Sequence, residues 1–258
     1  MKNCLTDYFM AYALLFIFHY SFFIIHFLSY LCTMYKQQLH MGNKLTAILL
    51  AALLPLLAGA QTVKVACVGN SITEGYALAH PETESYPAVL QQMLGQGYEV
   101  ANFGMSGHTL MNKGNKPYMA TQRYKDALAF SPDIVTIMLG TNDTKPVNWA
   151  HRDGFERDLR TMVAAFRALP SRPKVCLCLP VPAPSGQWGI NDSIITHGVI
   201  PVIRRVAADL SLTLIDLNAA MRPYPGYYTD GVHPDKRGAR VIAARIYAEL
   251  VEIKKVKN

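Results

Sequence analysis

Short apolar runs rich in β-branched residues alternate with helix-like segments along most of this 258-residue chain. In the helix-like segments, apolar residues recur at helical spacing, as in Phe155, Leu159 and Met162. Strands separated by single helices form βαβ units, which build a parallel sheet with helices on both faces. The predicted strands cover residues 63–69, 98–104, 133–139, 174–181 and 212–217. We therefore expect an α/β fold with three layers, α/β/α, around a five-stranded parallel sheet.

Two further segments of this region have distinct patterns. A final helix is predicted over residues 236–253, and its expected apolar surface consists of Val241, Ile242, Ala244, Ile246, Leu250 and Val251. The long irregular stretch is residues 180–193, "PVPAPSGQWGINDS". Long loops in compact domains are often functional, so this stretch is a candidate part of a binding site.

The N-terminal residues have a different composition. Residues 8–35 are almost continuously apolar and long enough to span a bilayer. Residues 41–60 have the pattern of a signal peptide, with Lys44 near the start, an apolar middle, and small residues Ala58 and Ala60 at the end. We expect an exported protein, periplasmic or secreted. Its expected parts are an over-extended start or membrane anchor at residues 1–40, the signal peptide at 41–60, and one catalytic domain at 61–258.

Composition argues against several classes of function. The net charge is +7, but basic residues cluster only in the last stretch, "EIKKVKN". Because no basic stripe is interleaved with aromatic residues, we expect no nucleic-acid partner. Beyond the leader the cysteines are Cys67, Cys176 and Cys178, an odd number at strand-like positions, which argues against a disulfide framework. No His/Cys cluster has metal-ligand spacing, so we expect no metal.

Polar turns follow the first three predicted strands. They are "GNSITEG", "NFGMSGHTL" and "LGTNDTKP". In an open parallel sheet, ligands bind beyond the carboxyl ends of the strands, near the point where the strand order reverses. In the flavodoxin-like order 2-1-3-4-5 the first strand lies between the second and the third. The three turns would then meet at one edge of the sheet.

A fourth polar segment, "YYTDGVHPDKRGA", precedes the last helix. Asp230 and His233 are three residues apart in it, so the carboxylate can accept a hydrogen bond from the imidazole. The other ring nitrogen would then be free to take a proton from a serine, and Ser71 is the candidate. Taken alone, this stretch favours Ser71 as a helix N-cap over a nucleophile, with Glu74 completing a capping box. A phosphate-binding loop is disfavoured because the Gly-Lys-Ser/Thr ending is absent.

Taken together, "GNSITEG", Gly104 in "NFGMSG", "GTND" and "DGVHP" resemble the ordered motifs of the SGNH (GDSL-type) hydrolases. Within that superfamily, the sequence is similar to carbohydrate O-acetylesterases of the sialate O-acetylesterase kind. The resemblance implies a nucleophilic Ser71, a general base His233 and an orienting Asp230. It also implies an oxyanion hole formed by the backbone N–H groups of Ser71 and Gly104 and the side-chain amide of Asn142. One departure is Asn70, which stands where the family usually has Asp.

The resemblance implies a serine esterase that hydrolyses O-acyl esters, above all O-acetyl groups on carbohydrates, without a cofactor. Its partner would be a small-molecule or glycan ester, with no membrane partner after processing unless residues 8–35 are a true anchor. Possible substrate contacts are His108, Trp188 and Tyr228. One alternative is a lysophospholipase or arylesterase acting on longer acyl chains. An alternative of another class is an inactive carbohydrate-binding module with the same fold.

Overall fold

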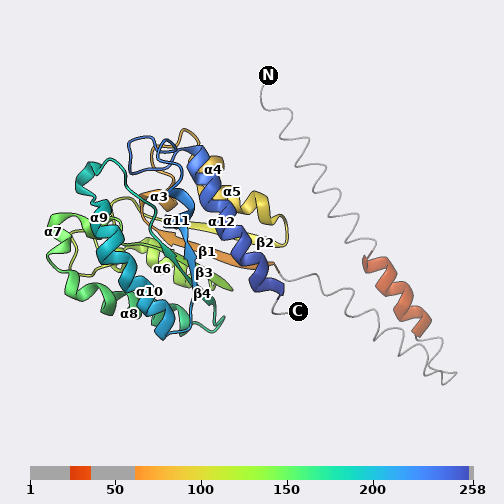
Figure 1. The fold of residues 1–258 in the computed structure, drawn as a ribbon. Coiled ribbons are helices and arrows are strands. Elements are labelled where there is room, and N and C mark those ends of the chain that lie inside the picture. Colours follow the sequence, from red (N-terminus) through yellow and green to blue (C-terminus); the bar gives the residue numbers. More distant parts are fainter. Residues whose placement is uncertain (1–23, 36–61, 256–258) are drawn as a thin grey trace. The chain divides into compact units, whose positions relative to one another are not determined.

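The computed structural model describes residues 24–35 and 62–255, with side chains described as far as residue 252. Contacts divide the chain into two units, Met1–Ala60 and Gln61–Asn258. In the first unit, residues 24–35 form a helix, drawn in red in Figure 1. The predicted signal peptide and the rest of the predicted apolar segment lie outside the described residues. Among the helices that are described, none combines the length and the apolar character needed to cross a bilayer.

The second unit is built on a five-stranded sheet whose neighbouring strands are all parallel, in the order β2-β1-β3-β4-β5 (Figure 1). This order confirms the predicted one. The strands are β1 (Val63–Gly69), β2 (Tyr98–Gly104), β3 (Ile134–Met138), β4 (Lys174–Leu179) and β5 (Thr213–Asp216). The first two have the predicted bounds, and the other three are shorter than predicted.

Side-chain chemistry explains the shorter strands. β4 ends at Leu179 because Pro180 follows it and has no N–H to donate to a neighbouring strand. β5 ends at Asp216 because this residue caps the next helix, its carboxylate accepting a hydrogen bond from the backbone N–H of Ala219 at 2.8 Å. Predicting a strand from apolar character alone overlooks such local competition.

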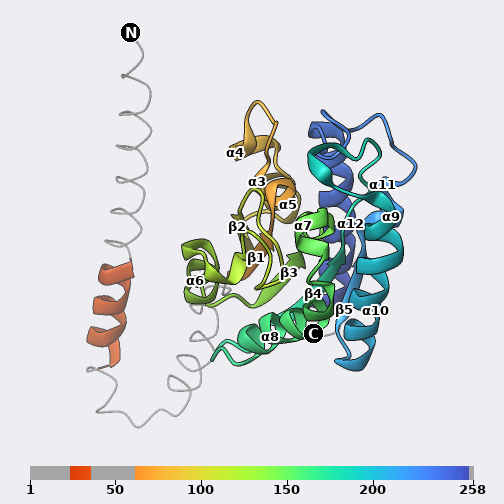
Figure 2. The same cartoon turned by 90° about the vertical axis from the view of Figure 1, so that its left-hand side faces the viewer.

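Helices cover both faces of the sheet (Figures 1 and 2). On one face lie α5 (Tyr86–Leu94) and α12 (Lys236–Lys255), which pack against each other. On the other face lie α6 (Gln122–Ala129), α8 (Phe155–Arg167) and α10 (Ile200–Asp209). Short helices lie in the connections: α3 (Ser71–Glu74), α4 (Pro81–Glu84), α7 (Pro146–Trp149), α9 (Asp192–Ile194), α11 (Leu217–Met221), the single-turn η1 (Tyr118–Ala120), η2 (Asn142–Thr144), η3 (Arg152–Gly154) and η4 (Gln187–Gly189), and the π-helical η5 (Ile195–Val199).

Strand periodicity divides the core into two clusters. Because side chains alternate across a strand, Ala66 and Val68 of β1 pack with α6, α8 and α10, whereas Val65 and Cys67 pack with α5 and α12. Cys176 and Cys178 share the second face and are buried, as their alternation in the sequence predicts, and both are free cysteines.

The last helix confirms its predicted start at residue 236 but not all of its predicted apolar surface. Ile242, Ile246 and Leu250 are fully buried, whereas Ala244 is exposed and its assignment to the apolar surface was wrong. The buried small residue is its neighbour Ala243. The core-facing stripe therefore follows positions 239, 242, 243, 246 and 250, the spacing of one helical face.

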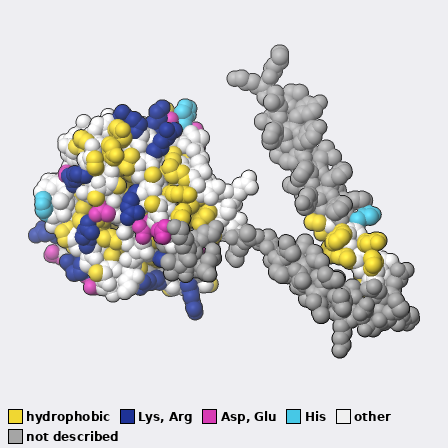
Figure 3. Space-filling model, turned by 45° about the vertical axis from the view of Figure 1, so that its right-hand side comes forward, with side chains coloured by type: hydrophobic (Ala, Val, Ile, Leu, Met, Phe, Trp, Pro, Cys, Tyr) yellow, Lys and Arg dark blue, Asp and Glu magenta, His cyan; other side chains and the backbone are white. Residues whose placement is uncertain are grey.

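Charged groups on the surface of this unit are mixed. On the face in Figure 3, Lys and Arg side chains lie among acidic and apolar ones. Ion pairs link several of the arginines to carboxylates; Glu156, for example, pairs with Arg160 and Arg205. The lysines that the structure describes in this unit take part in no such ion pair.

Candidate active site

Ser71 lies directly beyond the carboxyl end of β1, which lies between β2 and β3, at the start of α3. The N-cap of α3 is Asn70, whose side-chain oxygen accepts a hydrogen bond from the backbone N–H of Ile72 at 3.0 Å. Glu74 does not close a capping box, because its carboxylate accepts hydrogen bonds from the backbone N–H and the hydroxyl of Ser106. The alternative that Ser71 is merely a helix cap is therefore wrong.

A chain of hydrogen bonds links Ser71 to His233 and Asp230. Nε2 of His233 lies 2.9 Å from Oγ of Ser71, and Nδ1 lies 2.7 Å from Oδ2 of Asp230. Both Ser71 and His233 are buried. With Nδ1–H donating to the carboxylate, Nε2 presents its lone pair to the serine hydroxyl, which is the arrangement that a general base requires. The ring of Tyr76 covers the imidazole at a centroid distance of 4.6 Å.

Asp230 is held by donors on both oxygens. Oδ1 accepts the backbone N–H groups of Val232 and His233, at 2.9 Å and 2.8 Å. Oδ2 accepts the indole N–H of Trp188 at 3.1 Å in addition to His233. Burial alone would raise the pKa of this carboxyl, but the hydrogen bonds outweigh burial and hold the pKa well below its usual range. Asp230 is therefore ionised beside the imidazole at neutral pH.

The structure corrects the predicted role of Gly104. Its backbone N–H already donates to the side-chain oxygen of Asn102 at 2.9 Å, and the residue does not line the cleft beside Ser71. A Cβ at Gly104 would lie 2.1 Å from the backbone nitrogen of Glu74. The glycine is thus explained by the close packing of β2 against α3, and its N–H is not available to a substrate.

Gly107, three residues further on, has the properties of a backbone donor to an oxyanion, the role that was predicted for Gly104. It lines the cleft, and its φ of +79° is in the left-handed region that glycine adopts readily. Within the described part of the chain, its backbone N–H makes no hydrogen bond. Asn142 lines the same cleft and donates one of its two amide hydrogens to the carbonyl of His108 at 3.0 Å, which leaves the other free.

Buried polar groups fix the loop that carries Gly107. The carboxylate of Asp143 accepts the backbone N–H groups of Leu110 and Met111, at 2.9 Å and 2.8 Å. Its complete burial raises its pKa to about 6 despite these hydrogen bonds. The side chain of Asn148 donates to the carbonyl of Asn142 at 2.8 Å. The turn after β3 is thereby joined to the turn after β2.

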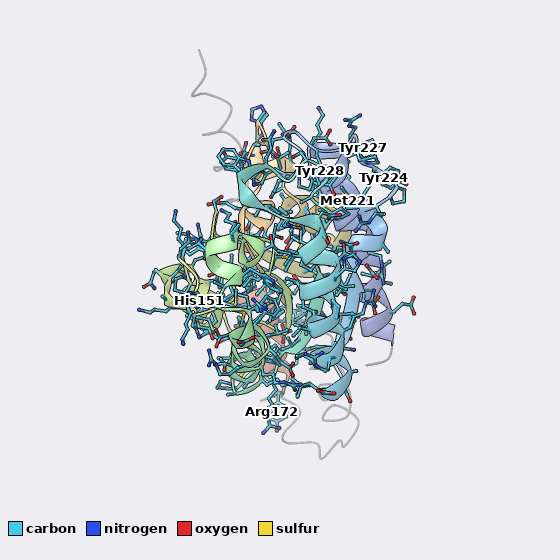
Figure 4. The ribbon with its side chains drawn as sticks, turned by 60° about the vertical axis from the view of Figure 1, so that its left-hand side comes forward. His151, Arg172, Met221, Tyr224, Tyr227 and Tyr228 are labelled. Atoms are coloured by element: carbon cyan, nitrogen blue, oxygen red, sulfur yellow. The ribbon has the colours of Figure 1, made fainter. Side chains whose placement is uncertain are left out.

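These groups surround a cleft of about 300 Å³. Of the three predicted substrate contacts, only Trp188 lines it; His108 and Tyr228 do not. His108 is held through Nδ1 to the carbonyl of Ser106 at 2.9 Å. Tyr228 lies beside Tyr227, in the part of the molecule that also contains Met221 and Tyr224 (Figure 4), and its ring packs against the core cluster of α5 and α12. The lining residues are Ser71, Tyr76, Ser106, Gly107, Lys116, Thr141, Asn142, Lys145, Trp188, Ile190, Val232 and His233.

Comparison with known proteins agrees with this geometry. Residues 67–241 match the GDSL-like Lipase/Acylhydrolase family, and these residues contain every group of the hydrogen-bonded chain. The chain belongs to this family.

Individual relatives extend the comparison. The chain is 43% identical over 206 residues to an acetylxylan esterase of Xylanibacter ruminicola, covering 73% of this chain and 43% of the relative. It spans less than half the length of the curated relatives that it matches. Among solved structures, a lipase/acylhydrolase from Enterococcus faecalis is 28% identical with a TM-score of 0.60, covering 73% of this chain and 95% of the other. A carbohydrate acetylesterase from Sinorhizobium meliloti shares the fold, with a TM-score of 0.60 at 19% identity. The match covers 74% of this chain and 100% of the other.

Several groups of this GDSL-family site were not predicted from the sequence. Tyr76, Lys116 and Lys145 lie in connecting segments, where a tyrosine or lysine has the pattern of an ordinary surface residue. His80, His151 and His197 belong to no motif and are exposed; His151, for example, lies beside α7 (Figure 4). In the described residues, no group of three or more His, Cys, Asp or Glu side chains could hold a metal ion.

Proposed function

We propose that this protein is a serine esterase that removes O-acetyl groups from carbohydrates. The observation that carries the proposal is the hydrogen-bonded chain from Ser71 through His233 to Asp230, at 2.9 Å and 2.7 Å. The name of its relative from Xylanibacter ruminicola, an acetylxylan esterase, supports an acetylated sugar as the substrate.

The first half-reaction follows from the positions of the proton donors and acceptors. Oγ of Ser71 attacks the acetyl carbonyl carbon while Nε2 of His233 takes the hydroxyl proton. The carbonyl oxygen becomes an oxyanion as its π bond opens. When the tetrahedral intermediate collapses, the bond from carbon to the sugar oxygen breaks, and His233 returns the proton to that oxygen. The products are the free sugar and acetyl-Ser71.

The second half-reaction repeats these steps with water. His233 removes a proton from a water molecule, the resulting hydroxide attacks the acetyl carbonyl, and collapse releases acetate. The proton held by His233 returns to Oγ of Ser71. Asp230 keeps its charge throughout and stabilises the imidazolium that forms in each half-reaction.

Three donors would stabilise the oxyanion: the backbone N–H groups of Ser71 and Gly107 and the amide of Asn142. All three residues line the same cleft. In other serine hydrolases, one such donor contributes on the order of 10² to 10³ in turnover, because it is already oriented before charge develops. The proposal thus assigns the second backbone donor to Gly107 and not to Gly104.

Initial rates with p-nitrophenyl acetate, p-nitrophenyl octanoate and an acetylated xylo-oligosaccharide test this proposal, with Ser71→Ala as the blank. We expect fast release of acetate, slow cleavage of octanoate, and loss of both in the blank. Preference for octanoate would indicate a lipid or aryl esterase. No activity above the blank would overturn the esterase assignment in favour of an inactive carbohydrate-binding module.

We further propose that the protein is exported, with cleavage before Gln61. The support is the signal-like pattern of residues 41–60. Mass spectrometry of the protein isolated from its native cells measures the N-terminus. A first residue of Gln61 is expected, and retention of residues 8–35 would show that they serve as an anchor.

A further inference from the structure

The cleft beside Ser71 contains two cationic groups that nothing neutralises. Lys116 and Lys145 both line it. Within the described residues, neither lysine takes part in an ion pair. No Asp or Glu is among the lining residues. The wall of the cleft therefore carries two positive charges without a countercharge.

Three carboxylates in the turns that build the site accept hydrogen bonds from other groups and, among the described residues, form no ion pair with these lysines. The two oxygens of Asp230 accept four hydrogen bonds, from Val232, from Trp188 and twice from His233. The two oxygens of Asp143 each accept a backbone N–H and are completely buried. Glu74 accepts two hydrogen bonds from Ser106.

The two lysines come from separate turns that the buried polar groups hold in place. Lys116 belongs to the turn after β2, where its carbonyl accepts the backbone N–H of Thr109 at 2.8 Å. Its side chain runs past Gly107, with Nζ 3.8 Å from the position that a Cβ would take there. Lys145 precedes α7, and its Cγ lies 3.8 Å from the corresponding position at Gly189. The ammonium group of Lys116 therefore lies beside Gly107, and the side-chain stem of Lys145 lies beside the segment that carries Trp188.

The like charges of these two lysines have an electrostatic cost. Lys145 is half-buried, and its burial together with the charge of Lys116 lowers its pKa. An anion bound between the two ammonium groups would relieve both effects and form charge-assisted hydrogen bonds. The same cleft is lined by Tyr76, Trp188 and Ile190, which offer aromatic and aliphatic surface on which a sugar ring can pack.

We propose that the sugar recognised by this cleft is acidic and that its carboxylate binds to Lys116 and Lys145. This inference rests on the proposed esterase function and defines the class of its substrate. In a uronic acid, the carboxylate is attached to the same ring as the hydroxyl groups that carry acetyl esters. A single ring can therefore place its acetyl group at Ser71 and its charge at the lysines.

The test compares two substrates that differ only in this charge: an O-acetylated methyl glucuronoside and the O-acetylated methyl glucoside, in which the carboxylate is replaced by a hydroxymethyl group. Acetate release gives kcat/KM for each. We expect the protein to favour the uronoside by about tenfold or more, the effect of one good charge-assisted contact. The preference should shrink as NaCl is raised, because salt screens exposed charges.

Variants assign the preference to the two lysines. Lys116→Gln and Lys145→Gln should each reduce the ratio of the two kcat/KM values several-fold, and the double variant should abolish it. Lys145→Arg, which keeps the charge, should retain most of it. Lys113→Gln is the matched control, since Lys113 is exposed on the same turn as Lys116 but does not line the cleft. A ratio near one in the natural protein, or an unchanged ratio in the double variant, would overturn the inference.

A binding measurement separates this inference from the proposed function. Isothermal titration with methyl glucuronoside and methyl glucoside, neither of which carries an ester, requires no turnover. Tighter binding of the uronoside that is lost in the double variant would support the inference even if every ester were inert. Equal binding of the two sugars, or no binding of either, would overturn it whether or not p-nitrophenyl acetate is cleaved.

Discussion

At the scale of single residues, Asn70 shows how a departure from a family motif can leave the site intact. The cap of α3 requires only an acceptor oxygen for the N–H of Ile72, and Asn supplies one as Asp does. The amide nitrogen of Asn70 is buried and, among the described residues, has no hydrogen-bond partner. The nucleophile-bearing turn thus keeps its geometry, and the substitution leaves one unsatisfied donor.

The hydrogen bond between Ser71 and His233 predicts that the two residues act as one unit. Ser71→Ala and His233→Ala should each nearly abolish kcat for p-nitrophenyl acetate, and the double variant should lose little more, because either change removes the same proton transfer. Steady-state rates of the three variants measure this coupling. Losses that multiply in the double variant would contradict the pairing.

The two glycines of "NFGMSG" predict different defects. Gly107→Ala introduces a side chain at a φ of +79°, so it should displace the N–H at the cleft and lower kcat on the order of 10²-fold, at a stability cost of roughly 1–2 kcal/mol. Gly104→Ala would place a Cβ 2.1 Å from the backbone nitrogen of Glu74, so its main effect should be a lower melting temperature. Melting curves and kcat of both variants separate these effects. A fully active Gly107→Ala would refute the assignment of this donor.

How far the sequence could predict the site follows from what each residue depends on. Ser71, His233 and Asp230 lie in ordered motifs, so they could be found without coordinates. Gly104 and Gly107 could not be told apart, because a sequence does not show which backbone N–H is occupied by a neighbouring side chain. Lys116 and Lys145 have no motif at all, and only the fold brings them together.

At the scale of elements, α12 shows the limit of a periodic pattern. The pattern predicts its start and its general apolar face, but adjacent alanines differ by only 100° around the helix axis, and Ala fits either face. In the structure Ala243 is fully buried and Ala244 is exposed. Which of the two alanines is buried depends on how the helix is rotated about its axis relative to the sheet.

A matched pair of substitutions tests that orientation. Ala243→Leu should overpack the core and lower the free energy of unfolding by about 1–3 kcal/mol. Ala244→Leu should change it by no more than about 0.5 kcal/mol, because its side chain points to solvent and Leu and Ala have similar helix propensities. Urea unfolding of both variants gives the two values. Equal losses would mean that the helix is rotated from the orientation described here.

At the scale of the whole molecule, the sheet order explains why the site assembles where it does. The position of β1 between β2 and β3 brings the three turns together, which follows from the flavodoxin-like order predicted for the sheet. The return of His233 from beyond the edge strand β5 was not predictable from that alternation. It depends on the turn at Asp230, where two backbone N–H groups bind one carboxylate oxygen. Two buried or half-buried carboxylates, Asp143 and Asp230, thus hold the turns together, and they respond to pH in opposite ways.

Their pH dependence gives a prediction for the stability of the molecule. The folded pKa of Asp143, about 6, exceeds the unfolded value near 4, so the folded state binds more protons between these limits. Its contribution to the free energy of unfolding should therefore fall by on the order of 3 kcal/mol as pH rises from about 4 to about 6. The folded pKa of Asp230 is depressed, so its contribution is present above about pH 4 and is lost only as pH falls below that value.

Urea unfolding at pH 3 to 7 of the natural protein, Asp143→Asn and Asp230→Asn measures both contributions. Relative to Asp143→Asn, the natural protein should lose stability between pH 4 and 6; relative to Asp230→Asn, it should lose stability only below pH 4. If the two differences followed the same course with pH, the opposite environments of these carboxylates would be disproved.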